Sequence, residues 1–531
     1  MPPHLRNGSP TSPALAEKVQ AVLDSRKLTL YEVSRRSAEL YGRSSPSFVP
    51  HNLYYDLRTG TFRPSIHQTV ALSRISGYCV SDWLRVFGFN LEDITRLQVL
   101  LPSKRTIVLD TSLTDPDEWV SRLDNRSDGT FPPPIAPLAK LLKVVPARRI
   151  GSLQCPASRR FLYAKVGRED VLAFPDLVPG SIVRVNPSVV NGISRDSSVI
   201  SERIFLVEHN KGFFCCRIRM GENGAIVPFD IRLRHAQVEL QCPREAKLWG
   251  TVDFEFRPLL HSEEPEVPTD LARRWKPQPL SSDESFGQLL KRTRRTRNLT
   301  VREAAEISRT VAEALNEERY MTSASSLSDY ELHDTAPRDF HKIITLCSIY
   351  GLHYAAVMQR LGVDTRAAGA ESMPDRYLSR ANSAVAAENA SAGEVPTGYL
   401  EKLMAACEEI PFFLRHSLEY FSGPARVSLD DFFWVGGDHD PLHPYLEKGL
   451  VVMVNRRRKT PIHFASKDLW QQPIYIVLKR DGTYLAACCG LEDGALVIHS
   501  YTQDFRRNEE YRLHQDADVI GQIVAIARRL T

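Results

Sequence analysis

Apolar residues near the start of the chain recur at helical spacing. Leu15, Val19, Val22 and Leu23 lie three or four residues apart, which places them on one face of an amphipathic helix. The stretch "SPSFVPHNLYYDL", residues 45–57, predicts a further helix, and a last apolar helix follows it. The pattern predicts a small helical domain.

A helix start of one kind occurs twice. In "LTLYEVSRRSAEL", Thr29 is followed three residues later by Glu32, and in "LTVREAAEIS" Thr300 stands in the same relation to Glu303. This Thr-x-x-Glu spacing is that of a capping box, which satisfies the free amides at a helix N-terminus. Apolar residues within 286–290 precede the second box, and "TSASSLSDYEL" follows it as another expected helix.

Two other regions alternate short apolar segments with turn residues. Examples are "SIVRV", "RIFLVEHNKGFFCCRIRM", "LVVMV" and "PIYIVLKRDGTYLAACC". The "HNKG" and "KRDG" sequences lie between apolar runs, which is typical of β-hairpins. These regions are predicted to be mostly β.

Several landmarks recur at a nearly constant offset. Pro64 and Pro337 lie 273 residues apart, and an offset of 274 separates Leu72 from Leu346, Ile75 from Ile349 and Gly77 from Gly351. An offset of 269 separates Pro175 from Pro444 and Gly180 from Gly449. Gly250 and Gly521 lie 271 residues apart. Their constant order favours an internal duplication over coincidence. We therefore expect a tandem A-B-A′-B′ repeat, in which A is helical and B is mostly β.

The repeat predicts these boundaries. Residues 12–100 and 283–364 form the helical domains, 145–260 and 425–531 form the β domains, 101–144 and 365–424 are linkers with short helices, and 261–282 is a linker.

Composition narrows the class of protein without identifying it. The chain has 531 residues with 43% hydrophobic and 25% charged residues, which is ordinary for a globular protein of several domains. A net charge of +4 does not by itself indicate nucleic acid. No apolar run is long enough for a membrane helix, and the Pro- and Ser-rich start is unlike a signal peptide. The nine cysteines contain no CxxC, so we expect buried thiols and a cytoplasmic location.

Common cofactor and metal motifs are absent from the sequence. There is no P-loop, GxGxxG, HExxH or GxSxG, so no cofactor is expected. "GGDHDPLHP" brings Asp438, His439, Asp440 and His443 together, but the flanking Gly and Pro disfavour the helix that a His-x-x-x-His site needs. We predict no metal site.

The helical regions resemble the helix-turn-helix domain of the XRE/λ-repressor family. The family's "LTxxEL/VA" second helix is similar to "LTLYEVS" and "LTVREAA", and its third helix and following turn are similar to "LYYDLRTGTFRP" and "LSDYELHDTAPR". The resemblance covers about 70 residues in each unit. Both units depart from the family by an insertion of about a dozen residues between the second and third helices, which puts the docking angle on DNA in question.

The resemblance implies that the third helix enters the major groove. In the first unit the implied DNA-facing residues are Ser47, His51, Asn52, Tyr54 and Tyr55, with Arg58 toward phosphate. In the second unit they are Thr322, Ser323, Ser325, Ser326 and Ser328. Because Asn pairs with adenine and hydroxyls pair with several base edges, one chain should prefer an asymmetric site.

A basic run strengthens this interpretation. Lys291, Arg292, Arg294, Arg295 and Arg297 crowd the end of a predicted first helix, where the family meets phosphate. The alternative is that both helical domains are plain bundles for protein contacts, with the serines acting as helix caps.

The β regions resemble the C-terminal domain of LexA/cI repressors, which belong to the self-cleaving Ser-Lys peptidases. "LAFPDLVPGSIVRV" and "PLHPYLEKGLVVMV" keep the family's Pro, Leu and Gly before an apolar strand. The nucleophile position holds Leu172 in one copy and Pro441 in the other, and the position of the Lys base falls on Cys216 and Ala486. Without a nucleophile or a base, no self-cleavage is expected.

Together these observations predict two helix-turn-helix domains alternating with two inactive LexA-like β domains. The expected function is a non-enzymatic transcription regulator that binds double-stranded DNA as a single-chain pseudo-dimer, with further homodimerisation left open. Two alternatives remain: a peptidase-repressor with displaced catalytic residues, and a protein-interaction scaffold.

Overall fold

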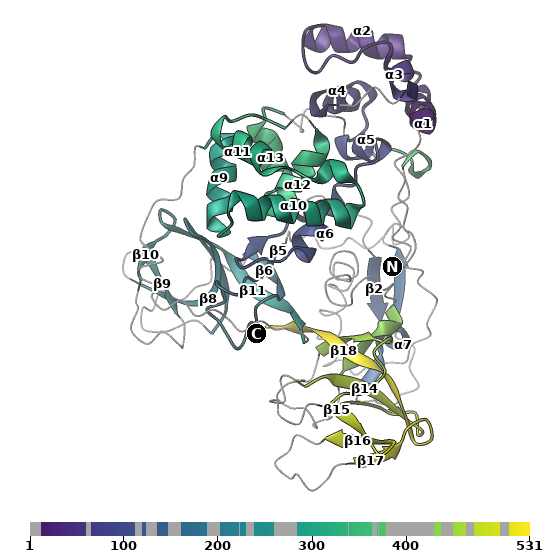
Figure 1. Ribbon diagram of the computed structural model, residues 1–531, viewed down its shortest axis with the longest axis vertical. Helices are drawn as coiled ribbons and strands as arrows, with labels where there is room; N and C mark the ends of the chain where they lie inside the picture. Colours follow the sequence, from purple (N-terminus) through teal and green to yellow (C-terminus); the bar gives the residue numbers. More distant parts are fainter. Residues whose placement is uncertain are drawn as a thin grey trace. The chain divides into compact units, whose positions relative to one another are not determined.

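The computed structural model describes the residues that carry most of these elements. They are 12–59, 65–111, 119–123, 135–146, 161–187, 202–221, 224–229, 238–259, 284–337, 339–363, 369, 371–378, 429–436, 446, 450–463, 472–499 and 509–530. Helices and a large antiparallel sheet make the chain a mixed α and β protein (Figure 1). It divides into two compact units, 1–101 with 109–114 and 281–383, and 102–108 with 115–280 and 384–531.

The first unit is helical and contains both stretches predicted as helical domains. Its first half comprises α1 (Ser12–Ser25), α2 (Leu30–Tyr41), α3 (Leu53–Thr59), α4 (Ile66–Ser76), α5 (Val80–Val86) and α6 (Glu92–Leu100). Its second half comprises α9 (Phe286–Thr296), α10 (Val301–Leu315), the 3₁₀ helix η5 (Glu318–Tyr320), α11 (Ala324–Leu332), α12 (Phe340–Tyr350), α13 (Tyr354–Arg360) and the 3₁₀ helix η7 (Asp375–Tyr377).

Both predicted capping boxes are confirmed. The Thr29 side chain accepts a hydrogen bond from the Glu32 amide while the Glu32 carboxylate accepts one from the Thr29 amide, and Thr300 and Glu303 form the same pair at α10. These reciprocal bonds fix where the second helix of each half begins.

A buried serine secures the segment between the second and third helices in each half. The Ser37 hydroxyl accepts a hydrogen bond from the amide of Val49 at 3.1 Å, and the Ser308 hydroxyl accepts one from the amide of Thr322 at 2.9 Å. Both serines are fully buried. The two insertions noted in the sequence are therefore held against the second helix, just before α3 and α11 begin.

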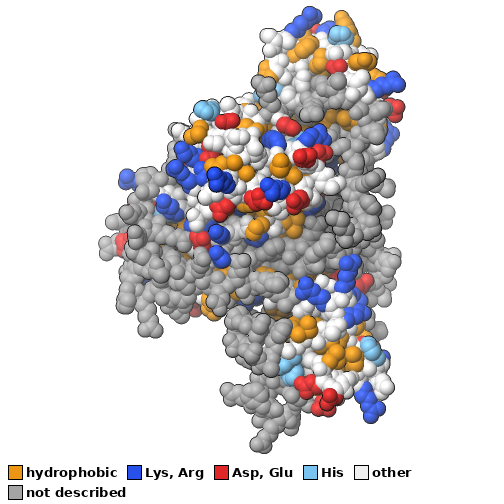
Figure 2. Space-filling view, viewed as in Figure 1, with side chains coloured by type: hydrophobic (Ala, Val, Ile, Leu, Met, Phe, Trp, Pro, Cys, Tyr) orange, Lys and Arg blue, Asp and Glu red, His pale blue; other side chains and the backbone are white. Residues whose placement is uncertain are grey.

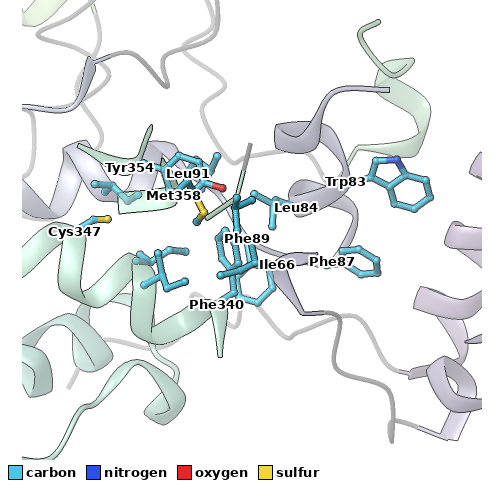
Figure 3. Packing of buried hydrophobic residues seen from close by; sticks show 14 of the residues in the cluster. Ile66, Trp83, Leu84, Phe87, Phe89, Leu91, Phe340, Cys347, Tyr354 and Met358 are labelled. Atoms are coloured by element: carbon cyan, nitrogen blue, oxygen red, sulfur yellow. The ribbon is translucent and has the colours of Figure 1, made fainter. Parts of the chain in front are cut away.

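Apolar packing joins the two helical halves. The ring of Phe89 lies 5.0 Å from that of Phe340 and 4.7 Å from that of His341, measured between centroids. Figure 3 shows Phe89 beside Phe340 in a cluster that also contains Tyr354 and Met358. Burying such aromatic surface stabilises the contact by several kcal/mol, at roughly 25 cal/mol per Å².

The segment after the first half binds a helix corner of the second half. Gln98 donates its amide to the Cys347 carbonyl at the end of α12, at 3.1 Å. The carboxylate of Asp110, which is fully buried, accepts a hydrogen bond from the Tyr354 amide at 2.5 Å and lies 3.3 Å from His353. Asp110 thus caps α13, whose own N-cap residue His353 makes no side-chain cap bond.

The segment after the second half binds the matching corner of the first half. The backbone of Glu371 exchanges hydrogen bonds with Gly77 and Cys79, at 3.0 and 2.9 Å. The Met373 amide donates to the carboxylate of Asp82 in α5 at 2.7 Å. Each half therefore extends a segment onto the corner between the fourth and fifth helices of the other.

The second unit is built from strands. The first set is β5 (Leu162–Lys165), β6 (Ile182–Asn186), β7 (Phe205–His209), β8 (Gly212–Met220), β9 (Ala225–Phe229), β10 (Leu240–Gln241) and β11 (Ala246–Pro258). The second set is β12 (Phe432–Val435), β13 (Leu450–Asn455), β14 (Ile474–Lys479), β15 (Tyr484–Glu492), β16 (Ala495–His499), β17 (Glu509–Arg512) and β18 (Ala517–Arg529).

The two sets pair their strands in the same order. In the first set β11 pairs with β6 and β7, β5 pairs with β6, and β8 to β10 continue from β7. In the second set β18 pairs with β13 and β14, β12 pairs with β13, and β15 to β17 continue from β14. The register shifts also match, at Leu248/Gly250 in β11 and Val519/Gly521 in β18.

Those two glycines allow a close strand crossing. A Cβ at Gly250 would lie 2.4 Å from the carbonyl oxygen of Asn186, and one at Gly521 would lie 2.6 Å from that of Asn455. Neither position has room for a side chain, which explains why Gly recurs at the 271-residue offset.

The long strands of the two sets pair with each other. β11 and β18 run antiparallel, with Phe256 opposite Ala527, Phe254 opposite Arg529 and Pro258 opposite Ala525. Phe256 and Ala527 are themselves 271 residues apart, so the pairing is centred on matching positions. Figure 1 shows β18, in yellow, reaching β11 at this join.

A buried carboxylate strengthens the join. Glu255 is fully buried, and its carboxylate accepts hydrogen bonds from Arg528 at 2.8 Å, Arg257 at 3.2 Å and the Ser181 hydroxyl at 2.7 Å. Although burial alone would raise the pKa of Glu255, the two guanidinium groups and these hydrogen bonds keep that pKa below its usual value.

One predicted linker contains more strand than expected. Residues 101–144 include β1 (Ile107–Val108), β2 (Trp119–Leu123), β3 (Ile135–Pro137), the short helix α7 (Leu138–Leu141) and the start of β4 (Leu142–Pro146), where short helices were expected. β1 pairs with β5 and β3 pairs with β12. The segment gains sheet hydrogen bonds at the edges of both strand sets, which short-range sequence patterns do not reveal.

Replacing Arg528 with Ala should weaken the join between the strand sets. The change removes one of the two guanidinium groups that stabilise the buried negative charge of Glu255. The free energy of unfolding of the β unit, measured by urea titration, should therefore fall by about 1–3 kcal/mol. The matched control is Arg529→Ala, which removes an exposed cation from the next position and should change stability by less than about 0.5 kcal/mol. Equal effects of the two substitutions would contradict the role given to Glu255.

Candidate nucleic-acid interface

Helix α3 presents a polar face to solvent. Its inner side is anchored by Leu53 and Leu57, which are buried. The predicted residues His51, Asn52, Tyr55 and Arg58 are exposed, with Tyr55 68% exposed, while Ser47 and Tyr54 are half-buried. The exposed set offers an amide, an imidazole, a phenol and a guanidinium group, all of which can hydrogen-bond to DNA.

Helix α11 presents hydroxyls instead. Ser323 is its N-cap, and the Ser323 hydroxyl accepts a hydrogen bond from the Ser326 amide at 3.1 Å and lies 2.9 Å from the Ser325 hydroxyl. Ser323 and Ser325 are exposed, and Ser326 and Ser328 are half-buried. Ser323 therefore caps α11 and is still exposed at the surface.

Thr322 leaves the DNA-facing set. It is only 1% exposed, and its hydroxyl lies 3.4 Å from the Tyr320 carbonyl. Its amide is the one held by Ser308. The sequence pattern could not separate Thr322 from the serines after it, because the bend that buries it depends on a tertiary contact.

Most of the basic run 291–297 is used within the fold. Arg292 pairs with Glu284 at 2.6 Å, and Arg294 pairs with both carboxylate oxygens of Glu331 at 2.7 and 2.8 Å. Arg297 is buried and donates to the Ile349 carbonyl, and burial lowers the pKa of Arg297 to about 10. Arg294 and Arg297 are largely buried and hold α9 against α11 and α12, whereas Arg292 pairs with a glutamate that directly precedes its own helix.

Two cations of the run remain at the surface. Arg295 is exposed and Lys291 is half-buried, and neither has a side-chain partner among the described residues. Figure 2 shows Lys and Arg interspersed with Asp and Glu over the visible face of helices α9–α13. The run therefore contributes two candidate phosphate contacts where the sequence suggested five.

The peptidase-like positions of the first strand set do come together. The Leu172 amide donates to the Cys215 carbonyl at 2.9 Å, and Leu172 lies in one apolar cluster with Cys216 and Phe214. Leu172 and Cys216 are both buried. The positions that the LexA resemblance would give to a nucleophile and a base are thus occupied here by a buried leucine and a buried cysteine.

In the second strand set only one of the two positions is described. Ala486 is buried beside Cys488 in an apolar cluster, while Pro441 lies outside the described residues. Ala486 has no group that could act as a base.

The buried cysteines are free thiols. Burial raises the pKa of Cys488 and Cys489 to about 12 and raises that of Cys215 well above its usual value. They are protonated at neutral pH and have little nucleophilic character.

The described part of the chain offers neither a metal-binding cluster nor a membrane-spanning helix. It contains no group of three or more His, Cys, Asp or Glu residues placed to hold a metal ion. Asp438, His439, Asp440 and His443 fall outside it. Within the same residues, no helix combines the length and apolarity that a membrane span requires.

No protein-family model, curated protein or solved structure matches this chain. The helix-turn-helix and LexA resemblances therefore rest on the residues and contacts described above.

Neighbouring arginines in the basic run should behave differently when replaced. Arg294→Ala leaves Glu331, whose side chain is 4% exposed, without its cation, and should lower the free energy of unfolding by about 3–5 kcal/mol. Arg295→Ala removes an exposed side chain and should leave stability unchanged within about 0.5 kcal/mol. Thermal and urea unfolding of the two variants measure the difference, and a stable Arg294→Ala protein would contradict the structural role.

Proposed function

We propose that this chain is a double-stranded DNA-binding transcription regulator that recognises an asymmetric site as a single-chain pseudo-dimer. The observation that carries the proposal is the pair of outward polar faces on α3 and α11. Each follows a capped second helix and is positioned by a buried serine, Ser37 or Ser308. This order is the one in which a helix-turn-helix domain presents its recognition helix.

An A-B-A′-B′ duplication underlies the pseudo-dimer. It is supported by the repeated capping boxes, by the matching strand pairings and by glycines at equivalent crossings, Gly250 and Gly521. Each compact unit contains one copy from each repeat. In this proposal the A copies associate with each other and the B copies do likewise, as subunits do in a two-fold dimer.

The two recognition surfaces differ in chemistry. Directly before α3, Asn52 would pair with adenine and His51 would contact a base edge. On α3 itself, Tyr55 would contact a base edge and Arg58 would contact phosphate. On α11, Ser323 and Ser325 would donate to or accept from several base edges or the backbone. The preferred operator is therefore two unlike half-sites about 34 Å, or one helical turn, apart.

In the proposed regulator the two strand sets would associate with each other and so hold the two repeats together. The pairing of β11 with β18 and the Glu255 contacts supply an association that separate subunits would have to make from solution. Tethering makes this association intramolecular and independent of concentration. In this proposal the regulator has no peptidase activity, which agrees with the buried apolar side chains at Leu172, Cys216 and Ala486. It would act in the cytoplasm and without a cofactor.

Selection from a random duplex library should enrich one asymmetric sequence. Against that sequence, Asn52→Ala should weaken binding by about 1–3 kcal/mol, roughly 5- to 150-fold, because a bidentate base contact is lost. Binding to a scrambled duplex should change little. Titration by fluorescence anisotropy at one stated salt concentration gives both affinities.

The matched control is Gln359→Ala, which removes an exposed amide from α13 and should leave both affinities unchanged. Failure of the library to enrich any sequence would favour an interaction scaffold over a DNA-binding regulator. Discrete fragments after prolonged incubation at alkaline pH would instead favour a peptidase-repressor with displaced catalytic residues.

A further inference from the structure

A compact basic turn follows strand β13. The strand ends at Asn455, and Arg456, Arg457, Arg458 and Lys459 come directly after it, all four exposed. The Asn455 carbonyl accepts a hydrogen bond from the Arg458 amide at 3.1 Å, and the Asn455 side chain accepts one from the Arg457 amide at 3.0 Å. These bonds close a tight turn, which we call the basic turn, that holds four cations close together.

Two of the four cations are attached to the fold. Arg456 forms an ion pair with Asp431 at 2.9 Å, and Arg458 donates to the side chain of Gln522 at 3.4 Å. These contacts orient the turn on the sheet from both sides.

The other two cations have no such attachment. Neither Arg457 nor Lys459 has a side-chain hydrogen bond or ion pair among the described residues. Adjacent like charges repel each other, and within the described part of the chain no ion pair offsets this repulsion at Arg457 and Lys459. A bound anion would compensate that repulsion.

The sequence that follows the equivalent strand of the first set carries no such basic run. Asn186 ends β6 and pairs with Thr251, as Asn455 ends β13 and pairs with Gln522, and each Asn carbonyl lies against the glycine of the long strand. Yet the sequence after Asn186 is "PSVV", without a basic residue. The same strand crossing is thus made without cations in one copy, so the crossing itself does not require them.

We propose that the basic turn binds the phosphate backbone of duplex DNA, through Arg457 and Lys459, as a contact additional to the two recognition helices. Guanidinium and ammonium groups match phosphate oxygens, with Arg able to donate two parallel hydrogen bonds. Their flexible, solvated side chains suit a sequence-independent contact. The inference rests on the proposed function, because DNA held by the helices places phosphate near the same chain at high effective concentration.

The test measures salt dependence with the full chain on a 40-base-pair duplex of random sequence. Each phosphate contact contributes about 0.9 to the slope of log affinity against log salt, so Arg457→Ala/Lys459→Ala should reduce the slope by about 1.8. The preference for a selected operator over random duplex should be retained, because the turn contacts no base edges.

The control variant is Arg244→Ala/Lys247→Ala, which removes two exposed cations from the turn before β11 and at the start of that strand. Its slope of log affinity against log salt should equal that of the unmodified chain, because these two cations lie in the first strand set and outside the basic turn. If the Arg457→Ala/Lys459→Ala variant showed the same slope of log affinity against log salt as the unmodified chain, the inference would be overturned. The regulator proposal would remain intact.

Two other outcomes separate the remaining explanations. A parent chain that binds no duplex at all would overturn the regulator proposal together with this inference. If vesicles containing phosphatidylglycerol bound the parent and not Arg457→Ala/Lys459→Ala, with DNA binding unchanged, the basic turn would be a lipid-binding site instead.

Discussion

The contact between the two helical halves is the constraint on which the proposed function depends. Phe89 against Phe340 buries aromatic surface, while Gln98 and Asp110 satisfy backbone groups at the end of α12 and the start of α13. Buried polar groups of this kind specify one arrangement, because any slip leaves them unsatisfied. If the halves could rotate freely, α3 and α11 would be two independent weak DNA contacts.

In the strand unit, too, the two copies are held together by buried contacts, here strand pairing and an ion-paired carboxylate. Its long strands pair around Phe256 and Ala527, and the arginines at matching positions, Arg257 and Arg528, share the single buried carboxylate of Glu255. Elsewhere in this unit, Leu172 and Cys216 lie together in a buried apolar cluster.

Local signals in the sequence predicted local structure well. The capping residues Thr29 and Thr300 and the hairpin turns could be identified because they act within a few residues. Thr322 and Arg297 were misassigned to DNA because their burial depends on tertiary contacts with Ser308 and Ile349. The basic turn at 456–459 stands out only in comparison with the other strand set, because the sequence after Asn186, at the equivalent strand end, has no such basic run.

The proposed pseudo-dimer requires that one chain hold two unlike recognition helices at a fixed separation. The decisive measurement is the affinity for the selected operator after base pairs are inserted between its half-sites. About five inserted base pairs rotate one half-site by half a helical turn. We expect a one-to-one complex whose affinity then falls to that of random duplex. Unchanged affinity at every spacing would show instead that the two helices are not held at a fixed separation.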